Sequence, residues 1–110
     1  MYKNIVLMII TTGMTLGAVS AQAAVDISSA ETLLLTNKCA KCHSVDKKKD
    51  GPSYKVTALK YKDAKDAEKK LYTHLITGPK VKIDDIEEEH VKIKGDEASI
   101  KNAVQYILTR

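Results

Sequence analysis

The chain contains no phenylalanine and no tryptophan, and it has only two cysteines and three methionines in 110 residues. All three methionines lie within the first 14 residues, so the rest of the chain lacks a thioether side chain. A domain of this size has a marginal apolar core unless a metal, a disulfide or a cofactor adds to it. With tyrosine as its only aromatic residue, the core would gain much from a bulky apolar group bound to the chain.

Strong charge of either sign is also missing. The sequence has 18 basic and 14 acidic residues and a formal net charge of +4. This mild bias does not favour nucleic acid as a partner. Internal repeats and low-complexity linkers are absent, and the length allows one domain at most.

The first 23 residues have the pattern of an export signal. Lys3 supplies a positive start, residues 5–19 are mostly apolar, and Ala21-Gln22-Ala23 has the small-x-small pattern that signal peptidase accepts. Cleavage there would leave Ala24 as the first of 110 − 23 = 87 residues, with a formal charge of 17 − 14 = +3. We therefore expect a periplasmic protein.

An uncleaved membrane anchor is the alternative interpretation of this segment. The apolar run is short for the roughly 30 Å of hydrocarbon that a spanning helix must cross. Small and polar residues also interrupt it, namely Thr11, Thr12, Gly13, Thr15 and Gly17. No cysteine stands near the cleavage site, so we expect no lipid anchor there. After cleavage of the signal we expect no membrane span.

Two short helices are expected early in the mature chain. Ser28-Ser29-Ala30-Glu31 has the spacing of a capping box and predicts a helix over about residues 29–37. A second helix is expected over residues 53–60, after a Gly-Pro turn, with Val56 and Leu59 facing inward.

Two further helices are expected later in the chain. Asp63 can cap a helix over residues 64–77 that Gly78-Pro79 would end, and Asp96 can cap the last helix. The last helix should pack on the first, with Tyr106 near the contact. Its apolar residues recur with helical spacing and are Ile100, Ala103, Val104, Ile107 and Leu108.

Residues 80–95 differ from these helices because their apolar residues are scattered among charges. Brief alternation resembles a strand, but no turn and partner strand are evident. An isolated strand pair would also be unstable alone. We therefore expect an extended loop, without a hairpin, that packs over another part of the domain.

Cys39-Ala40-Lys41-Cys42-His43 has the C-x-x-C-H spacing of covalent haem attachment. Two cysteines three positions apart at a helical turn can form thioethers with the two vinyl groups at one porphyrin edge. The imidazole of His43 can then reach the iron. Such attachment takes place outside the cytoplasm, in agreement with an export signal, so we expect one haem c bound to Cys39, Cys42 and His43.

Three other uses of the cysteines are less favoured. A thioredoxin-like redox pair would need a βαβ pattern that this chain lacks. A disulfide between residues three apart closes too small a loop to stabilise the fold. A zinc site built from Cys39, Cys42, His74 and His90 lacks the short spacing between histidines that zinc fingers have.

From Ala30 to Arg110 the sequence resembles the small bacterial class I cytochromes c of the c-551/c-552 type. The resemblance implies an all-α class I cytochrome c fold, with three or four helices around one haem and the first and last helices crossing. It also implies that His43 is the proximal iron ligand and that its other ring nitrogen donates to the carbonyl of Pro52. The segments that carry it are Cys42-His43-Ser44-Val45-Asp46-Lys47-Lys48, Gly51-Pro52-Ser53-Tyr54, Lys60-Tyr61 and Tyr106-Ile107-Leu108.

The resemblance fails at the second axial ligand. In that family it is a methionine on the loop before the last helix, usually followed by prolines, and residues 24–110 have no methionine and no such prolines. His90 stands at the matching distance before the last helix, so we expect His43 and His90 to be the two metal ligands. The alternatives are an open iron or ligation by His74, Lys80, Lys82, Lys92 or Lys94.

The ligand pair decides the chemistry. Thioether ligation raises the reduction potential of cytochromes c, so its replacement by imidazole should lower the potential. We expect a monomeric single-electron carrier of low potential and no enzymatic activity, because no catalytic acid, base or nucleophile is evident. If His90 binds weakly or not at all, the iron would take NO, O₂ or CO, and the protein would bind or sense small ligands.

Charges gather on both sides of the expected site. A lysine rim surrounds the attachment motif, near where the resemblance places the exposed haem edge, and could dock an acidic redox partner. An ordinary solubilising surface is the alternative. An acidic run before His90 would favour the oxidised iron. The lysine rim is Lys38, Lys41, Lys47, Lys48 and Lys49, and the acidic run is Asp84, Asp85, Glu87, Glu88 and Glu89.

Mass spectrometry of the protein secreted from a host that matures cytochromes c tests these expectations together. The chain should begin at Ala24 and carry the added mass of one haem. An unmodified polypeptide would contradict the attachment motif, and a retained segment 1–23 would contradict cleavage of the signal.

Overall fold

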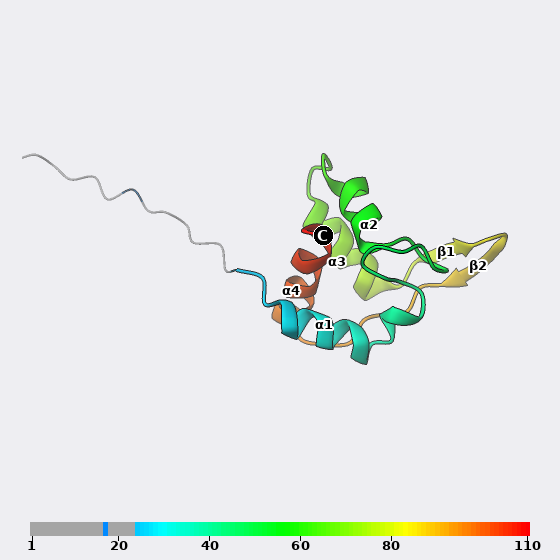
Figure 1. The fold of residues 1–110 in the computed structure, drawn as a ribbon, viewed down its shortest axis with the longest axis horizontal. Helices are drawn as coiled ribbons and strands as arrows, with labels where there is room; N and C mark the ends of the chain where they lie inside the picture. The colour runs from blue at the N-terminus through cyan, green and yellow to red at the C-terminus, as the bar shows by residue number, and fades with distance from the viewer. Residues whose placement is uncertain (1–16, 18–23) are drawn as a thin grey trace, which may run out of the picture.

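The computed structural model describes residues 24–110 and Gly17, so the expected export signal over residues 1–23 lies outside the described residues apart from that glycine. Four helices form the body of the domain, and a short hairpin projects from it (Figure 1). The elements are α1 (Ile27–Thr36), a single 3₁₀ turn η1 (Cys39–Lys41), α2 (Tyr54–Tyr61), α3 (Ala67–Thr77), β1 (Lys80–Ile83), β2 (Ile86–Glu89) and α4 (Glu97–Leu108). No helix in this part of the chain is long and apolar enough to cross a membrane.

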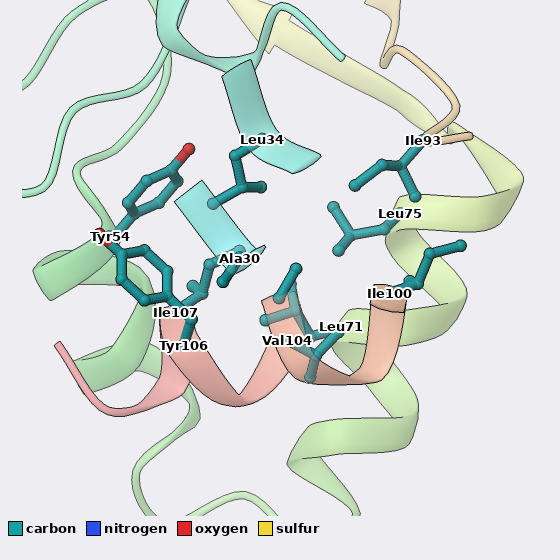
Figure 2. Close-up of a cluster of buried hydrophobic side chains, with 11 residues drawn as sticks. Ala30, Leu34, Tyr54, Leu71, Leu75, Ile93, Ile100, Val104, Tyr106 and Ile107 are labelled. Atoms are coloured by element: carbon teal, nitrogen blue, oxygen red, sulfur yellow. The ribbon is translucent and has the colours of Figure 1, made fainter. Parts of the chain in front are cut away.

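α1 and α4 cross and form the centre of the core, as the sequence predicts (Figure 1). The apolar stripe of α4 faces α1, and Tyr106 is buried at the contact, where its hydroxyl donates to Glu31 Oε1 over 3.1 Å. A second contact ties the start of α1 to α4, because the Asn102 side chain pairs with both backbone groups of Asp26. Figure 2 shows the cluster of buried side chains around this crossing.

Two of the expected helix starts are wrong. The capping residue of α1 is Asp26, whose carboxylate accepts from Ser29 N, so the helix begins before the expected Ser28 box. α3 begins after Asp66, which adopts a left-handed conformation, and the expected cap Asp63 precedes it by a turn. The cap Asp96 and the end of α3 before Gly78-Pro79 are confirmed. Ser53, expected within α2, caps that helix instead.

The buried face of α2 also differs from the expectation. Val56 and Leu59 are 54% and 69% exposed, while Tyr54, the first residue of the helix, is buried. α2 is only eight residues long and makes its main helix contact with α4. The first turn of so short a helix decides which face it buries. The spacing of apolar residues over two turns therefore predicts the buried face poorly.

The sequence predicts an extended loop without a hairpin over residues 80–95, and this prediction is wrong. β1 and β2 pair in antiparallel register, with Asp84 at a positive φ in the two-residue turn between them. The register places Lys80 opposite Glu89 and Lys82 opposite Glu87, and opposite charges in such positions stabilise a strand pair. The hairpin is not isolated, because Val81 and Ile83 are half-buried along a cavity of the domain.

Candidate cofactor site

A cavity of about 360 Å³ opens between α1, the attachment motif, α3 and the hairpin. This volume lies in the range of small-molecule and cofactor pockets. Its walls are mainly apolar, from residues such as Leu34, Leu71 and Ile107. The polar groups that reach it include both cysteines and all three histidines of the chain, namely Cys39, Cys42, His43, His74 and His90.

The attachment motif forms one tight turn at the cavity wall. Lys38 adopts a left-handed conformation that ends α1 and redirects the chain into η1. The amides of Cys42 and His43 both donate to the Cys39 carbonyl, over 3.1 and 2.9 Å. This turn brings both cysteines to the cavity. Burial raises the pKa of the Cys39 thiol above its ordinary value.

His43 is held by a polar contact on one ring nitrogen and by ring contacts on its face. Its Nδ1 lies 2.7 Å from the Pro52 carbonyl oxygen, which fixes the tautomer with Nδ1–H as donor and leaves the Nε2 lone pair free. The Tyr54 ring stacks beside it at 5.8 Å between centroids. The chain is also close at Gly51, where an added Cβ would stand 2.8 Å from His43 Nδ1.

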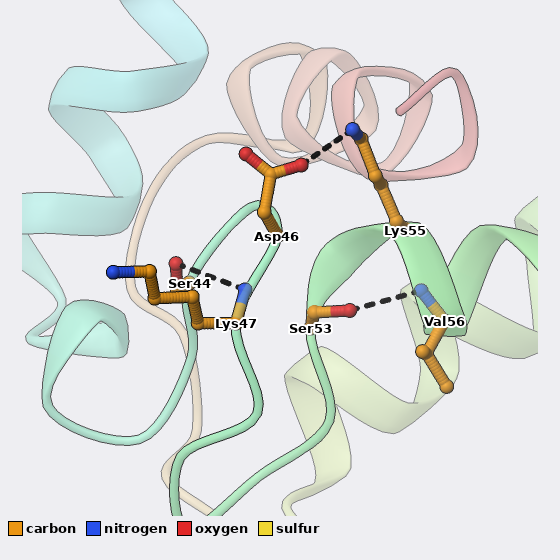
Figure 3. Close-up of polar contacts among 6 residues, drawn as sticks. All are labelled: Ser44, Asp46, Lys47, Ser53, Lys55 and Val56. Carbon is orange, nitrogen blue, oxygen red and sulfur yellow. Dashed lines mark hydrogen bonds and ion pairs between the residues drawn. The ribbon is translucent and has the colours of Figure 1, made fainter.

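The loop that presents Pro52 is folded back on itself. The amides of Tyr54 and Lys55 donate to the carbonyls of Ser44 and Val45, over 2.9 and 3.2 Å. Figure 3 shows the side-chain contacts of this loop, in which Ser53 accepts from Val56 N and Asp46 forms an exposed ion pair with Lys55. The carbonyl that orients His43 is therefore anchored from both sides.

His90 follows β2 directly and lines the same cavity. Its amide donates to the Pro79 carbonyl over 2.9 Å, and its backbone passes so close to Gly78 that no Cβ would fit there. Its Nδ1 lies 2.8 Å from the Val91 carbonyl, so Nε2 is the free ring nitrogen here as well. Burial lowers the pKa of His90, which favours a neutral imidazole near neutral pH.

All three histidine rings come together at this cavity. The centroids of His43 and His90 are 6.1 Å apart, and those of His90 and His74 are 4.7 Å apart, in an edge-to-face arrangement. His74 is half-buried on α3, and burial lowers its pKa as well. In the part of the chain that the structure describes, no three histidine, cysteine or acidic side chains are placed to hold a metal ion.

The donor set and the cavity fit haem c. Two thiols stand on one turn, a histidine with an oriented tautomer follows them, and the space in front of that histidine is bounded by apolar side chains. The lysines that were alternative ligands are placed differently. Lys82 reaches the cavity rim, whereas Lys80, Lys92 and Lys94 are exposed and do not line the cavity.

Sequence reasoning gave no separate role to two residues at this cavity. Tyr54 stacks on His43, and Asn37 joins the end of α1 to the backbone of Lys94. Nothing in the spacing of either residue points to these contacts, because both depend on segments that are distant in sequence.

Comparison with known proteins agrees with this geometry. Residues 27–110 match the family model of cytochrome c. The class 1 cytochrome MtoD from Sideroxydans lithotrophicus ES-1 is 50% identical, with a TM-score of 0.76 over 78% of this chain and 97% of that one. Wild-type cytochrome c552 from Nitrosomonas europaea is 30% identical, with a TM-score of 0.61 over 72% and 96%. No curated protein matches the chain significantly.

Gly51→Ala tests the close fit around His43. The added methyl group would collide with the imidazole, so the ring or the loop must move. We expect the haem-loaded protein to lose about 1–3 kcal/mol in its free energy of unfolding, measured by urea titration. Lys48→Ala, in the same loop but exposed, should stay within about 0.5 kcal/mol of the natural protein. Equal unfolding curves for the two variants would contradict the close contact between Gly51 and the His43 ring.

Proposed function

This chain belongs to the cytochrome c family, and from that premise we propose that it carries single electrons in the periplasm through one haem c with His43 and His90 as axial ligands. The family and the class I neighbours establish the coarser statement, a mono-haem electron carrier with covalently bound haem c. Beyond this, we propose the pair of axial ligands, a low reduction potential and the periplasmic location.

The separation of the two imidazoles carries the proposal. Histidine nitrogen lies about 2.0–2.1 Å from a first-row metal such as zinc, so two imidazoles on opposite sides of one metal have ligating nitrogens roughly 4 Å apart and ring centroids roughly 6 Å apart. The centroids of His43 and His90 are 6.1 Å apart. His90 is thus at the distance that a second axial ligand requires.

The hydrogen bonds of both rings favour the same roles. Each Nδ1 is engaged by a backbone carbonyl, that of Pro52 for His43 and that of Val91 for His90. Each Nε2 therefore keeps its lone pair for a metal, and each ring is held in orientation by its own backbone contact. His74 has no comparable hydrogen bond among those formed by the described residues, and the rival assignment is weaker for that reason.

When bound, haem c supplies an iron that takes up and returns one electron without breaking a bond in a substrate. The residues of the chain hold it and set its properties. Cys39 and Cys42 would fix one edge by thioethers, and the apolar walls around Leu34, Leu71 and Ile107 exclude water. Two imidazoles in place of imidazole and thioether lower the reduction potential.

Negative charge next to His90 also lowers the reduction potential. The acidic run occupies the turn of the hairpin and β2, and Glu88 and Glu89 reach the edge of the cavity. Negative charge there stabilises the more positive ferric state. We propose no enzymatic role.

His90→Ala tests the axial assignment, with His74→Ala as its matched control. We expect absorption and resonance Raman spectra of the natural protein to be six-coordinate and low-spin in both oxidation states. His90→Ala should become high-spin when reduced and bind added CO, while His74→Ala keeps the low-spin spectrum. An unchanged spectrum in His90→Ala would remove His90 from the iron. CO binding by the natural protein as fast as by His90→Ala would favour the ligand-binding function instead.

The lysine rim is the proposed docking surface for an acidic redox partner. All five of its lysines are exposed, although Lys49 also donates to the Ala40 carbonyl. Charge of this kind speeds association by roughly tenfold or more at low salt. The triple variant Lys47→Gln/Lys48→Gln/Lys49→Gln should slow oxidation of the reduced protein by an anionic reagent such as ferricyanide and weaken its dependence on ionic strength. The same rate and salt dependence in the variant would show that the rim only aids solubility.

A further inference from the structure

The segment that carries His90 has no regular structure of its own between β2 and α4. Three backbone tethers hold it against the helices. His90 N donates to the Pro79 carbonyl, Ile93 N donates to the Leu75 carbonyl over 2.9 Å, and Lys94 is bound on both sides by Asn37. The first two tethers join the segment to α3 and the turn after it, and the third is its only hydrogen-bonded link to α1 among the described residues.

Asn37 uses both ends of its amide in this third tether. Its Oδ1 accepts from Lys94 N over 2.8 Å, and its Nδ2 donates to the Lys94 carbonyl over 3.0 Å. The same Nδ2 lies 2.9 Å from the Leu33 carbonyl at the end of α1. Asn37 is half-buried, lines the cavity and stands two positions before Cys39. One side chain therefore links the attachment turn to the segment of the opposite axial histidine.

We propose that Asn37 is a positioning residue that keeps His90 seated at the iron by clamping Lys94 to the end of α1. In the described structure Ile93 is the only buried residue between His90 and α4. Without the clamp, the hydrogen bonds of His90 and Ile93 to Pro79 and Leu75 remain, and Gly95 still packs beside Leu33 of α1, but no hydrogen bond joins the segment to α1. The segment could then swing away from α1 and take His90 with it.

This inference rests on the proposed function, because it concerns how firmly His90 is bound. It predicts a kinetic effect and not a change of ligand. Opening of the loop is needed before an added ligand can replace His90, so the rate of replacement reports the strength of the clamp. Loss of the side-chain hydrogen bonds at Asn37 should raise that rate by roughly tenfold or more.

Asn102 provides a matched control within the same chain. Its Oδ1 accepts from Asp26 N over 2.9 Å, and its Nδ2 donates to the Asp26 carbonyl over 2.8 Å. The geometry is the same as that of Asn37 with Lys94, but the clamp joins α4 to the start of α1, and Asn102 does not line the cavity. A general loss of stability should therefore appear in both variants, and loosening of His90 in only one.

The experiment measures the rate at which carbon monoxide replaces the distal ligand in the reduced, haem-loaded protein, mixed rapidly with CO. Asn37→Ala should react roughly tenfold faster than the natural protein, and Asn102→Ala should stay within about a factor of two of it. Asn37→Asp, which keeps the acceptor but loses both donated bonds, should also be faster and serves if Asn37→Ala does not fold. Absorption of the oxidised variants should remain low-spin, because the ligand itself is unchanged.

Equal CO rates in the Asn37 and Asn102 variants would overturn the proposal. His90→Ala separates this outcome from a failure of the proposed function. If the natural protein already binds CO as fast as His90→Ala, His90 is not an iron ligand. Both the proposed axial pair and the role of Asn37 are then wrong. If His90→Ala is fast, the natural protein is slow and Asn37→Ala is no faster than Asn102→Ala, only the role of Asn37 is wrong.

Discussion

The spacing of two imidazoles across an apolar cavity is the constraint on which the rest of this structure depends. A core without phenylalanine or tryptophan cannot fill the space between α1, α3 and the attachment motif by itself. A haem attached at Cys39 and Cys42 would fill it, and the proposed axial pair requires a nitrogen from each of two segments. His43 is held from the N-terminal half by the Pro52 carbonyl, and His90 is held from the C-terminal half by the hairpin and its tethers.

The parts of the site that follow from local chemistry were predictable from the sequence. The attachment motif needs only its spacing, and the helix cap at Asp96 needs only one side chain near one amide. The proximity of His90 to His43 was predicted from the position where the family has a methionine, because residue spacing alone does not bring the two rings together. The geometry now gives it a physical basis, the 6.1 Å between ring centroids.

The parts that depend on contacts between distant segments were missed. The hairpin can be recognised in the sequence only if Lys80 and Lys82 are paired with Glu89 and Glu87. That pairing requires the register of the two strands to be known. The exposure of Val56 and Leu59 follows from the way a two-turn helix lies on α4. The clamp by Asn37 joins residues 57 positions apart, and no local sequence pattern predicts such a contact.

The direct test of the account is near-infrared magnetic circular dichroism of the oxidised natural protein. The position of the low-spin ferric charge-transfer band depends on the pair of axial ligands, and the method needs no mutation. The account predicts the band of two imidazoles. A band typical of imidazole with an amine, or the bands of high-spin iron, would contradict the central claim that His43 and His90 hold the iron between them.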